Sequence, residues 1–321
     1  MLSWRILQTV IALALLLSMA WLDEYGPRPG LVMLPLALVG AMMCVGEFLG
    51  LFASAERHGL SASRSLLPTR WVVFAGTLLV VVASTAPVTF AFPDGGRLGF
   101  GGWMSLGLAL ALMLVVGEQM RRFQGVTRPD GTIAIRIARA MLVIAYLGIS
   151  VGFMIGLRIL EGPHPTHPAR WGLLALLTMV AIVKMSDSGA YITGHAIGRH
   201  KMAPKLSPGK TWEGFAGGMV AAVLGALLFL GPIAQWMGCD AQVTGAAWWI
   251  GVISFAIVVA LAGVVGDLAI SLLKRDAGVK DSSTWMPGFG GFLDLLDSIL
   301  LAAPVAYLLW VAGIVGPALP P

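Results

Sequence analysis

The sequence predicts an all-α polytopic membrane protein, and two observations carry that prediction. Hydrophobic residues make up 58% of the 321 positions and charged residues only 12%, whereas a soluble domain carries about 25% charged residues. Apolar runs of about 20 residues, long enough to cross a bilayer core, recur along the chain. Because backbone polar groups in lipid must be satisfied within their own segment, we expect these runs to be helices.

Nine apolar runs are candidates for membrane-spanning helices, and we expect residues 1–321 to form a single integral membrane domain. The first run has no small-residue cleavage motif before Asp23, so we interpret it as a true span rather than a signal peptide. The expected spans are residues 5–22, 31–53, 71–92, 101–118, 140–160, 171–193, 214–236, 247–272 and 292–314.

The positive charges indicate how these spans are oriented. Fifteen of the 21 lysine and arginine residues lie in the loops after spans two, four, six and eight, and five lie on the opposite side. Because basic loops stay in the cytoplasm, we expect both the N-terminus and the C-terminus outside. This bias also accounts for the net charge of +5. We expect no nucleic-acid partner, since no basic face with base-stacking groups accompanies the charge.

Apart from Arg5 and Arg158, which are counted among the five cations of the opposite side, seven ionisable side chains lie within or at the edge of the spans, where each costs about 2.5–3.5 kcal/mol on insertion scales. Glu118 ends a span on the cytoplasmic side, so solvation explains it. Glu47 lies about two turns inside its span, and both a structural pairing with a neighbouring helix and a functional role stay open. The remaining five are Lys184, Asp187, Asp267, Asp294 and Asp297.

Four aspartates among these five are expected at a similar depth on the cytoplasmic side. Lys184 and Asp187 share one helix face, as do Asp294 and Asp297. Asp267 lies about 10 Å from the end of its span, at about 1.5 Å per residue. Satisfied Lys–Asp pairs would be the structural explanation, but one lysine cannot neutralise four carboxylates. We therefore expect a divalent cation such as Mg²⁺, which prefers carboxylate oxygens.

Two basic loops, residues 198–214 and 274–291, adjoin these acids and combine lysine with serine, threonine and glycine. Such residues suit phosphates, because they offer fixed charge, hydroxyl donors and close backbone approach. The Gly209-Lys210-Thr211 sequence is not a P-loop, since Pro204 stands where that motif needs glycine and no strand is expected before it. Acids beside cationic loops favour phosphoryl or nucleotidyl transfer between a water-soluble reactant and a lipid.

Several motifs in these segments together resemble a known family signature. They are Ser271-Leu-Leu-Lys-Arg-Asp-Ala-Gly-Val-Lys-Asp-Ser-Ser, Pro287-Gly-Phe-Gly-Gly, Asp294-Leu-Leu-Asp-Ser, Asp187-Ser-Gly-Ala-Tyr, and Lys205 with Ser207-Pro-Gly-Lys-Thr-Trp-Glu-Gly. The family is that of the phosphatidate cytidylyltransferases, or CDP-diacylglycerol synthases. The resemblance covers residues 184–300, the expected catalytic core, whereas the spans within residues 1–118 match only in being hydrophobic.

The resemblance implies transfer of CMP from CTP to phosphatidic acid or a related lipid phosphate, at the cytoplasmic face of a bacterial-type inner membrane. It implies Mg²⁺ bound by Asp267 and Asp294, with Asp297 and Asp187 close by, and leaves a second, monovalent cation open. It also suggests a homodimer. The expected catalytic residues are Asp267, Asp294, Lys280 and Asp281, and the expected substrate-binding residues are Ser207, Lys210, Thr211, Lys274, Arg275 and Ser282.

The chain departs from the family pattern at two positions, since Phe289 replaces a histidine and Leu295 an arginine. These changes keep open a CTP-dependent enzyme that acts on another lipid, an isoprenoid-lipid phosphate or a polyprenol. An ion-coupled transporter is a weaker alternative. Transporters commonly show repeated halves and a midplane site, whereas this sequence shows no repeat and gathers its acids at one face.

Overall fold

The computed structural model describes residues 18–20, 22–24, 26, 28–59, 66–89, 98–123, 131–162, 169–239, 245–283 and 290–315. Within these ranges, seven helices are long and apolar enough to cross a membrane, as expected of an integral membrane protein built from helices. The expected span at 5–22 lies mostly outside the described residues.

The helices follow the expected spans with small differences at their ends. Their bounds, with those of two short strands, are α2 (Leu34–Gly59), α3 (Arg70–Ser84), α4 (Ala86–Thr89), α5 (Gly99–Arg121), α6 (Thr132–Arg158), α7 (Ala169–Ile197), β1 (Lys201–Ala203), β2 (Ser207–Thr211), α8 (Trp212–Leu228), η2 (Phe229–Ile233), α9 (Ala234–Trp236), α10 (Ala246–Asp276) and α11 (Phe292–Val311).

The expected span at 71–92 is the one that differs most. Helix α3 has only 15 residues, and the chain turns at Thr85 before α4 begins. Pro87 explains the break, because a proline is tolerated in a helix's first turn but removes a hydrogen bond from a helix interior. The hydroxyls of Ser84 and Thr85 donate to the carbonyls of Val81 and Val82, at 2.6 and 2.7 Å, and stabilise the turn.

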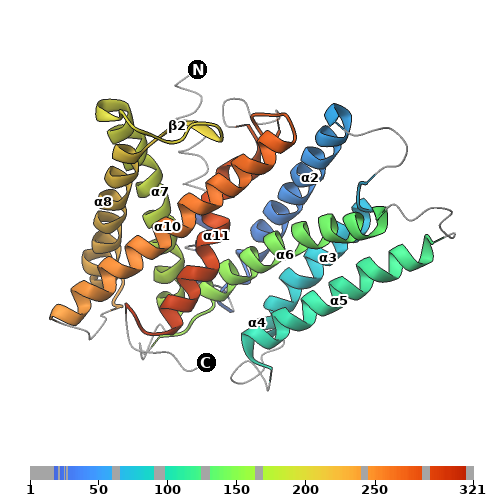
Figure 1. Cartoon of the computed structure of the whole chain (residues 1–321). Helices are drawn as coiled ribbons and strands as arrows, with labels where there is room; N and C mark the ends of the chain where they lie inside the picture. The colour runs from blue at the N-terminus through green and yellow to red at the C-terminus, as the bar shows by residue number, and fades with distance from the viewer. Residues whose placement is uncertain are drawn as a thin grey trace. The chain divides into compact units, whose positions relative to one another are not determined.

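The chain divides into two compact units, one built from residues up to 155 together with 273–295 and one from 156–272 together with 296 onward. In the first unit, α3 packs against both α5 and α6. A side chain at Gly107 would collide with Ala83, and one at Gly148 with Val80. Small residues of this kind let membrane helices approach closely, and Figure 1 shows α3 and α5 side by side.

The second unit has a similar seam between α7 and α8, which lie side by side in Figure 1. Gly189 and Gly217 leave no room for a Cβ, because Ala221 and Thr193 lie directly against them. Helix α10 joins this core at Gly263, where an added Cβ would lie 3.5 Å from both Val183 and the Ser298 carbonyl. The unit therefore brings α7, α10 and the second part of α11 together.

An antiparallel hairpin of β1 and β2 connects α7 to α8, pairing Lys201 with Thr211 and Ala203 with Ser207. The sequence analysis expected a loop here and did not predict these strands. Glu213, in the first turn of α8, fixes the hairpin by accepting the backbone N–H groups of Arg199 and His200. The loop that was expected to bind phosphate is therefore an ordered element.

Candidate functional site

Asp267 is held in the second unit by a lysine from the hairpin. The Nζ of Lys210, near the end of β2, lies 2.8 Å from Asp267 Oδ2, and the two side chains are 23% and 28% exposed. The hydroxyl of Ser271, one turn further along α10, donates to Asp267 Oδ1 at 3.3 Å. The hairpin therefore places a cation directly against a carboxylate of α10.

Asp187 lies near this pair on α7. Lys184 lies 3.5 Å from Asp187 on the same helix face, and both side chains are 39% exposed. Ser298, Asp267 and Lys210 also lie close enough to the Asp187 carboxylate to interact with it electrostatically. We call Lys184, Asp187, Lys210 and Asp267 the acid–lysine cluster. Its aspartates come from two helices and stay partly accessible.

Asp297 belongs to the same unit but is more enclosed. It is 7% exposed, and its Oδ1 accepts the backbone N–H and the hydroxyl of Ser298 at 2.7 and 3.2 Å. Its own backbone carbonyl packs against Gly266 of α10, where a Cβ would come within 2.5 Å. Asp297 thus lies where α11 meets α10.

Asp294 is enclosed by its own unit. Its Oδ1 accepts Lys274 Nζ at 2.7 Å, and the two side chains are only 10% and 12% exposed. Its Oδ2 accepts the backbone N–H of Ser282 at 2.9 Å and that of Gly291 at 3.0 Å, and the Ser282 hydroxyl lies at 3.0 Å. We call Lys274, Ser282, Gly291 and Asp294 the Asp294 network.

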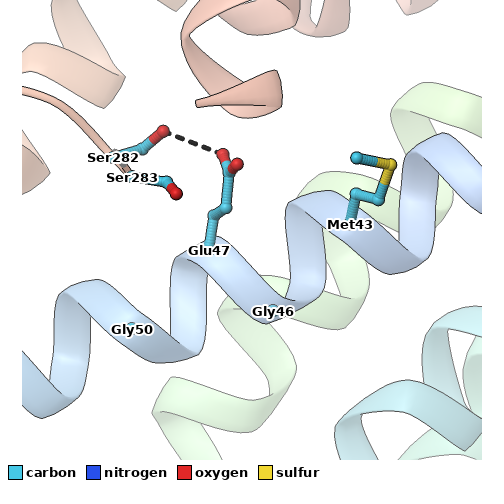
Figure 2. A pocket seen from close by; sticks show the side chains of 6 residues that line it. All are labelled: Met43, Gly46, Glu47, Gly50, Ser282 and Ser283. Atoms are coloured by element: carbon cyan, nitrogen blue, oxygen red, sulfur yellow. Dashed lines mark hydrogen bonds between the residues drawn. The ribbon is translucent and has the colours of Figure 1, made fainter. Parts of the chain in front are cut away.

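Glu47 joins the Asp294 network from α2. Its carboxylate accepts the Ser282 hydroxyl and the backbone N–H groups of Phe292 and Leu293, each at 2.8 Å. Figure 2 shows the Glu47 side chain pointing from α2 toward Ser282. Both residues line an open pocket of about 420 Å³, together with Met43, Gly46, Gly50 and Ser283. The sequence analysis left the role of Glu47 open, and these contacts show a pairing with the start of α11.

The remaining residues of the predicted site differ in how they are engaged. Thr211 is buried and serves as the N-cap of α8, its hydroxyl oxygen accepting the N–H of Gly214 at 3.1 Å. The Arg275 guanidinium is exposed and donates to the Val279 carbonyl at 3.4 Å. Ser207 lies in β2, half-buried, while Lys280 and Asp281 are exposed in the segment after α10.

One premise of the metal prediction is wrong. The sequence analysis counted a single lysine for four carboxylates, but Lys210 and Lys274 reach in from the loops and pair with Asp267 and Asp294. Within the described ranges, no three His, Cys, Asp or Glu side chains form a metal-binding group. The donor chemistry of Asp187 and Asp267 still fits a hard cation, since both offer partly exposed carboxylate oxygens.

Only one of the two residues that depart from the family pattern lies within the described residues. Leu295 lies in the first turn of α11, directly after Asp294. Phe289 lies outside the described residues, as does the preceding Pro287.

Sequence reasoning missed the partners of Glu47, the Ser298 contact of Asp187 and the hairpin that carries Lys210. For the hairpin alone the sequence held a signal, because Pro204 marks the turn that connects β1 to β2.

Comparison with known proteins assigns this chain to a family. Over 293 residues the chain is 32% identical to a phosphatidate cytidylyltransferase of Pseudomonas aeruginosa, which covers 88% of this chain and 95% of the relative. It is 40% identical over 154 residues to the enzyme of that name in Haemophilus influenzae, covering 48% and 51%. It is 37% identical over 163 residues to that of Brucella suis, covering 51% and 53%.

Two of these matches, to the relatives of Haemophilus influenzae and Brucella suis, span only about half the length of the relative. The model of the cytidylyltransferase family, in contrast, matches residues 3–312. It therefore includes α2 and Glu47, which the sequence analysis placed in the region of weak resemblance. The chain belongs to the cytidylyltransferase family.

Proposed function

We propose that this protein transfers CMP from CTP to phosphatidic acid, forming CDP-diacylglycerol and pyrophosphate. The observation that carries the proposal is the acid–lysine cluster, in which two lysines and two partly exposed aspartates lie together in the segments that resemble the family signature. Relatives named phosphatidate cytidylyltransferase support the same reaction.

The chemistry suits a site without a strong general base. A phosphate oxygen of phosphatidic acid, ionised at neutral pH, attacks the α-phosphorus of CTP, and pyrophosphate leaves as the bond to the β-phosphate breaks. Little covalent work falls to the protein, so positioning and charge stabilisation provide most of the catalysis. The partly exposed contact of Lys210 with Asp267 supports a role for Lys210 in offsetting phosphate charge, and the family resemblance adds Lys274 to the phosphate-binding residues.

A divalent cation is part of the proposal. Asp187 and Asp267 would hold Mg²⁺ in the acid–lysine cluster, and the family resemblance adds Asp294 and Asp297 to the proposed ligands. When bound, the ion would neutralise phosphate charge and activate the α-phosphorus. The partial exposure of Asp187 and Asp267 supports this role, since lysine contacts at 28–39% exposed carboxylates can be exchanged for a ligand.

We also propose that the protein works at the cytoplasmic face of a bacterial inner membrane, as a homodimer, with both termini outside. The positive charge of the loops after spans two, four, six and eight supports this orientation. Reporter fusions at Pro321 and within residues 119–139 test it. A cytoplasmic reporter signal from the C-terminal fusion would contradict the proposed topology.

A second candidate is a cytidylyltransferase that acts on another lipid phosphate. The observation that favours it is the pair of changes at Phe289 and Leu295, which remove a family imidazole and guanidinium from segments beside Asp294. Loss of cationic groups there would change the contacts available to the acceptor rather than to the carboxylates.

The decisive assay uses purified protein in detergent with labelled CTP, Mg²⁺ and a lipid. Phosphatidic acid should give a labelled CDP-lipid together with pyrophosphate. An isoprenoid-lipid phosphate that reacts faster than phosphatidic acid would favour the second candidate. Absence of labelled lipid and of pyrophosphate with both acceptors would exclude transferase activity.

A further inference from the structure

Glu47 is a buried carboxylate far in sequence from the family motifs it contacts. Among the described residues it accepts hydrogen bonds from Ser282, Phe292 and Leu293, which lie 235 to 246 residues away. Two of these donors are backbone N–H groups at the start of α11, which have no partner within their own helix. A carboxylate there is favoured by the helix dipole as well. Glu47 therefore caps α11 from another helix.

The groups that Glu47 holds are the same ones that hold Asp294. The Ser282 hydroxyl lies 2.8 Å from Glu47 Oε2 and 3.0 Å from Asp294 Oδ2. Gly291 lies between the two carboxylates: its N–H donates to Asp294, and a Cβ on it would overlap both Ser282 Oγ and Glu47 Oε2. Glu47 and Asp294 therefore both contact the Ser282 segment and the residues at the start of α11.

Helix α2 contacts the start of α11 at a second point. Gly40, two turns before Glu47, lies against the Phe292 ring, and a Cβ there would come within 2.8 Å of it. The backbone N–H of Phe292 is bonded by Glu47 while its ring rests on Gly40. Helix α2 therefore fixes both the position and the direction of the first turn of α11, where Asp294 lies.

We propose that Glu47 is a positioning residue for the transferase site: it holds the Ser282 loop and the first turn of α11 so that Asp294 keeps its contacts with Lys274, Ser282 and Gly291. The role in catalysis rests on the proposed function. Glu47 contacts no reacting atom and acts only through the Asp294 network.

The test compares Glu47→Gln with Glu118→Gln. A glutamine at 47 must turn its NH₂ group toward either the Phe292 N–H or the Leu293 N–H and Ser282 hydroxyl, so donors would face donors. Glu118 is the matched control: it is buried, at 4% exposed, and not solvated as the sequence had led us to expect, and it pairs with Arg121 and Arg122 of its own helix. Both variants remove one buried carboxylate from the same unit, and only one of them adjoins Asp294.

Two measurements follow. Hydrogen–deuterium exchange at the Ser282 and Gly291 amides, which donate to Asp294 and not to Glu47, should become about 10-fold faster or more in Glu47→Gln and stay unchanged in Glu118→Gln. In the CDP-lipid assay, kcat should fall about 10- to 100-fold in Glu47→Gln, with KM values for CTP and lipid changing little.

Unchanged exchange at both amides would overturn the inference, as would an undiminished kcat accompanied only by a lower melting temperature. If the wild-type protein forms no CDP-lipid, the proposed function fails, while the exchange measurement still decides whether Glu47 positions Asp294. Should Glu47→Gln fail to fold, Glu47→Asp serves instead. It keeps the charge but shortens the reach, and should give faster exchange at the same two amides.

Discussion

The acid–lysine cluster and the Asp294 network use the same residue types in opposite ways. Asp187 and Asp267 are 39% and 28% exposed, and each pairs with one lysine. Asp294 is 10% exposed and receives a lysine and two backbone N–H groups. An enclosed carboxylate with several donors is fixed in place, whereas a half-exposed one with a single cation can exchange it for a ligand. A fixed carboxylate such as Asp294 suits the alignment of a site, whereas an exchangeable one such as Asp267 suits the binding of a ligand.

Because of this difference, we expect substitutions in the two regions to affect activity and stability differently. A change in the acid–lysine cluster should alter activity while leaving the fold intact, because ion pairs between partly accessible side chains contribute only about 0–1 kcal/mol. A change in the Asp294 network should alter stability as well, because it leaves a buried charge or donor without a partner.

The largest effect is expected for Asp267→Asn. The substitution keeps the size of the side chain but removes the charge that pairs with Lys210 and that would hold Mg²⁺. We expect kcat/KM in the CDP-lipid assay to fall about 10³-fold, as for loss of a principal electrostatic group, with the melting temperature in detergent nearly unchanged.

Glu56→Gln is the control, since Glu56 forms a comparably exposed pair with Arg139, each 18% exposed, in the other unit. It should leave kcat/KM within about twofold of wild type, because Glu56 and Arg139 are not among the residues of the predicted site. Near wild-type turnover of Asp267→Asn at limiting Mg²⁺ would show that the metal assignment is wrong.

The next largest effect is expected for Asp294→Asn, and it should appear first in stability. The substitution leaves the Lys274 ammonium, only 12% exposed, without its carboxylate. Breaking a buried pair from one side costs about 3 kcal/mol, measurable as a lower midpoint of thermal unfolding in detergent. The double variant Lys274→Met/Asp294→Asn removes the unpaired ammonium and keeps a side-chain oxygen for the Ser282 and Gly291 N–H groups, so it should recover most of that loss but remain inactive. A single variant as stable as wild type would mean that the network is not a fixed element.

Much of the fold was predictable because lipid imposes strong constraints on sequence. Eight of the nine expected spans coincide with helical segments within the described residues, since each must be a long apolar run. The break between α3 and α4 was missed because hydropathy does not register one proline inside an apolar run. The hairpin was missed because its strands have only three and five residues and carry no alternating pattern.

The site was predictable in residue type but not in pairing. Helical spacing correctly placed Lys184 beside Asp187, because residues three apart face each other. No such rule connects Lys210 with Asp267 or Lys274 with Asp294, since these contacts depend on the fold between them. The partners of Glu47 are further still from sequence reasoning, being more than 230 residues away along the chain. Residue spacing predicts contacts within one helix, but it does not predict contacts between segments that are far apart in the sequence.

A smaller effect, confined to the Asp294 network, is expected for Gly291→Ala. The added methyl group would overlap Ser282 Oγ and Glu47 Oε2, and relieving such an overlap costs about 1–3 kcal/mol. Gly50→Ala on α2 is the control, because nothing lies within 4 Å of its added Cβ and alanine favours a helix interior. It should unfold at or above the wild-type temperature, whereas Gly291→Ala should unfold below it. Equal midpoints would argue against close packing at Gly291.

The smallest effect is expected for Lys184→Met, and it tests the open character of the acid–lysine cluster. The Lys184–Asp187 contact is longer than the Lys210–Asp267 contact, 3.5 against 2.8 Å, and both of its side chains are 39% exposed. Exposed pairs of this kind contribute about 0–1 kcal/mol, so the melting temperature should barely change. Lys210→Met, measured in parallel, should lower kcat/KM more strongly, because Lys210 directly contacts Asp267. If Lys184→Met destabilised the protein as much as Asp294→Asn, the two regions would not differ in the way that their exposure indicates.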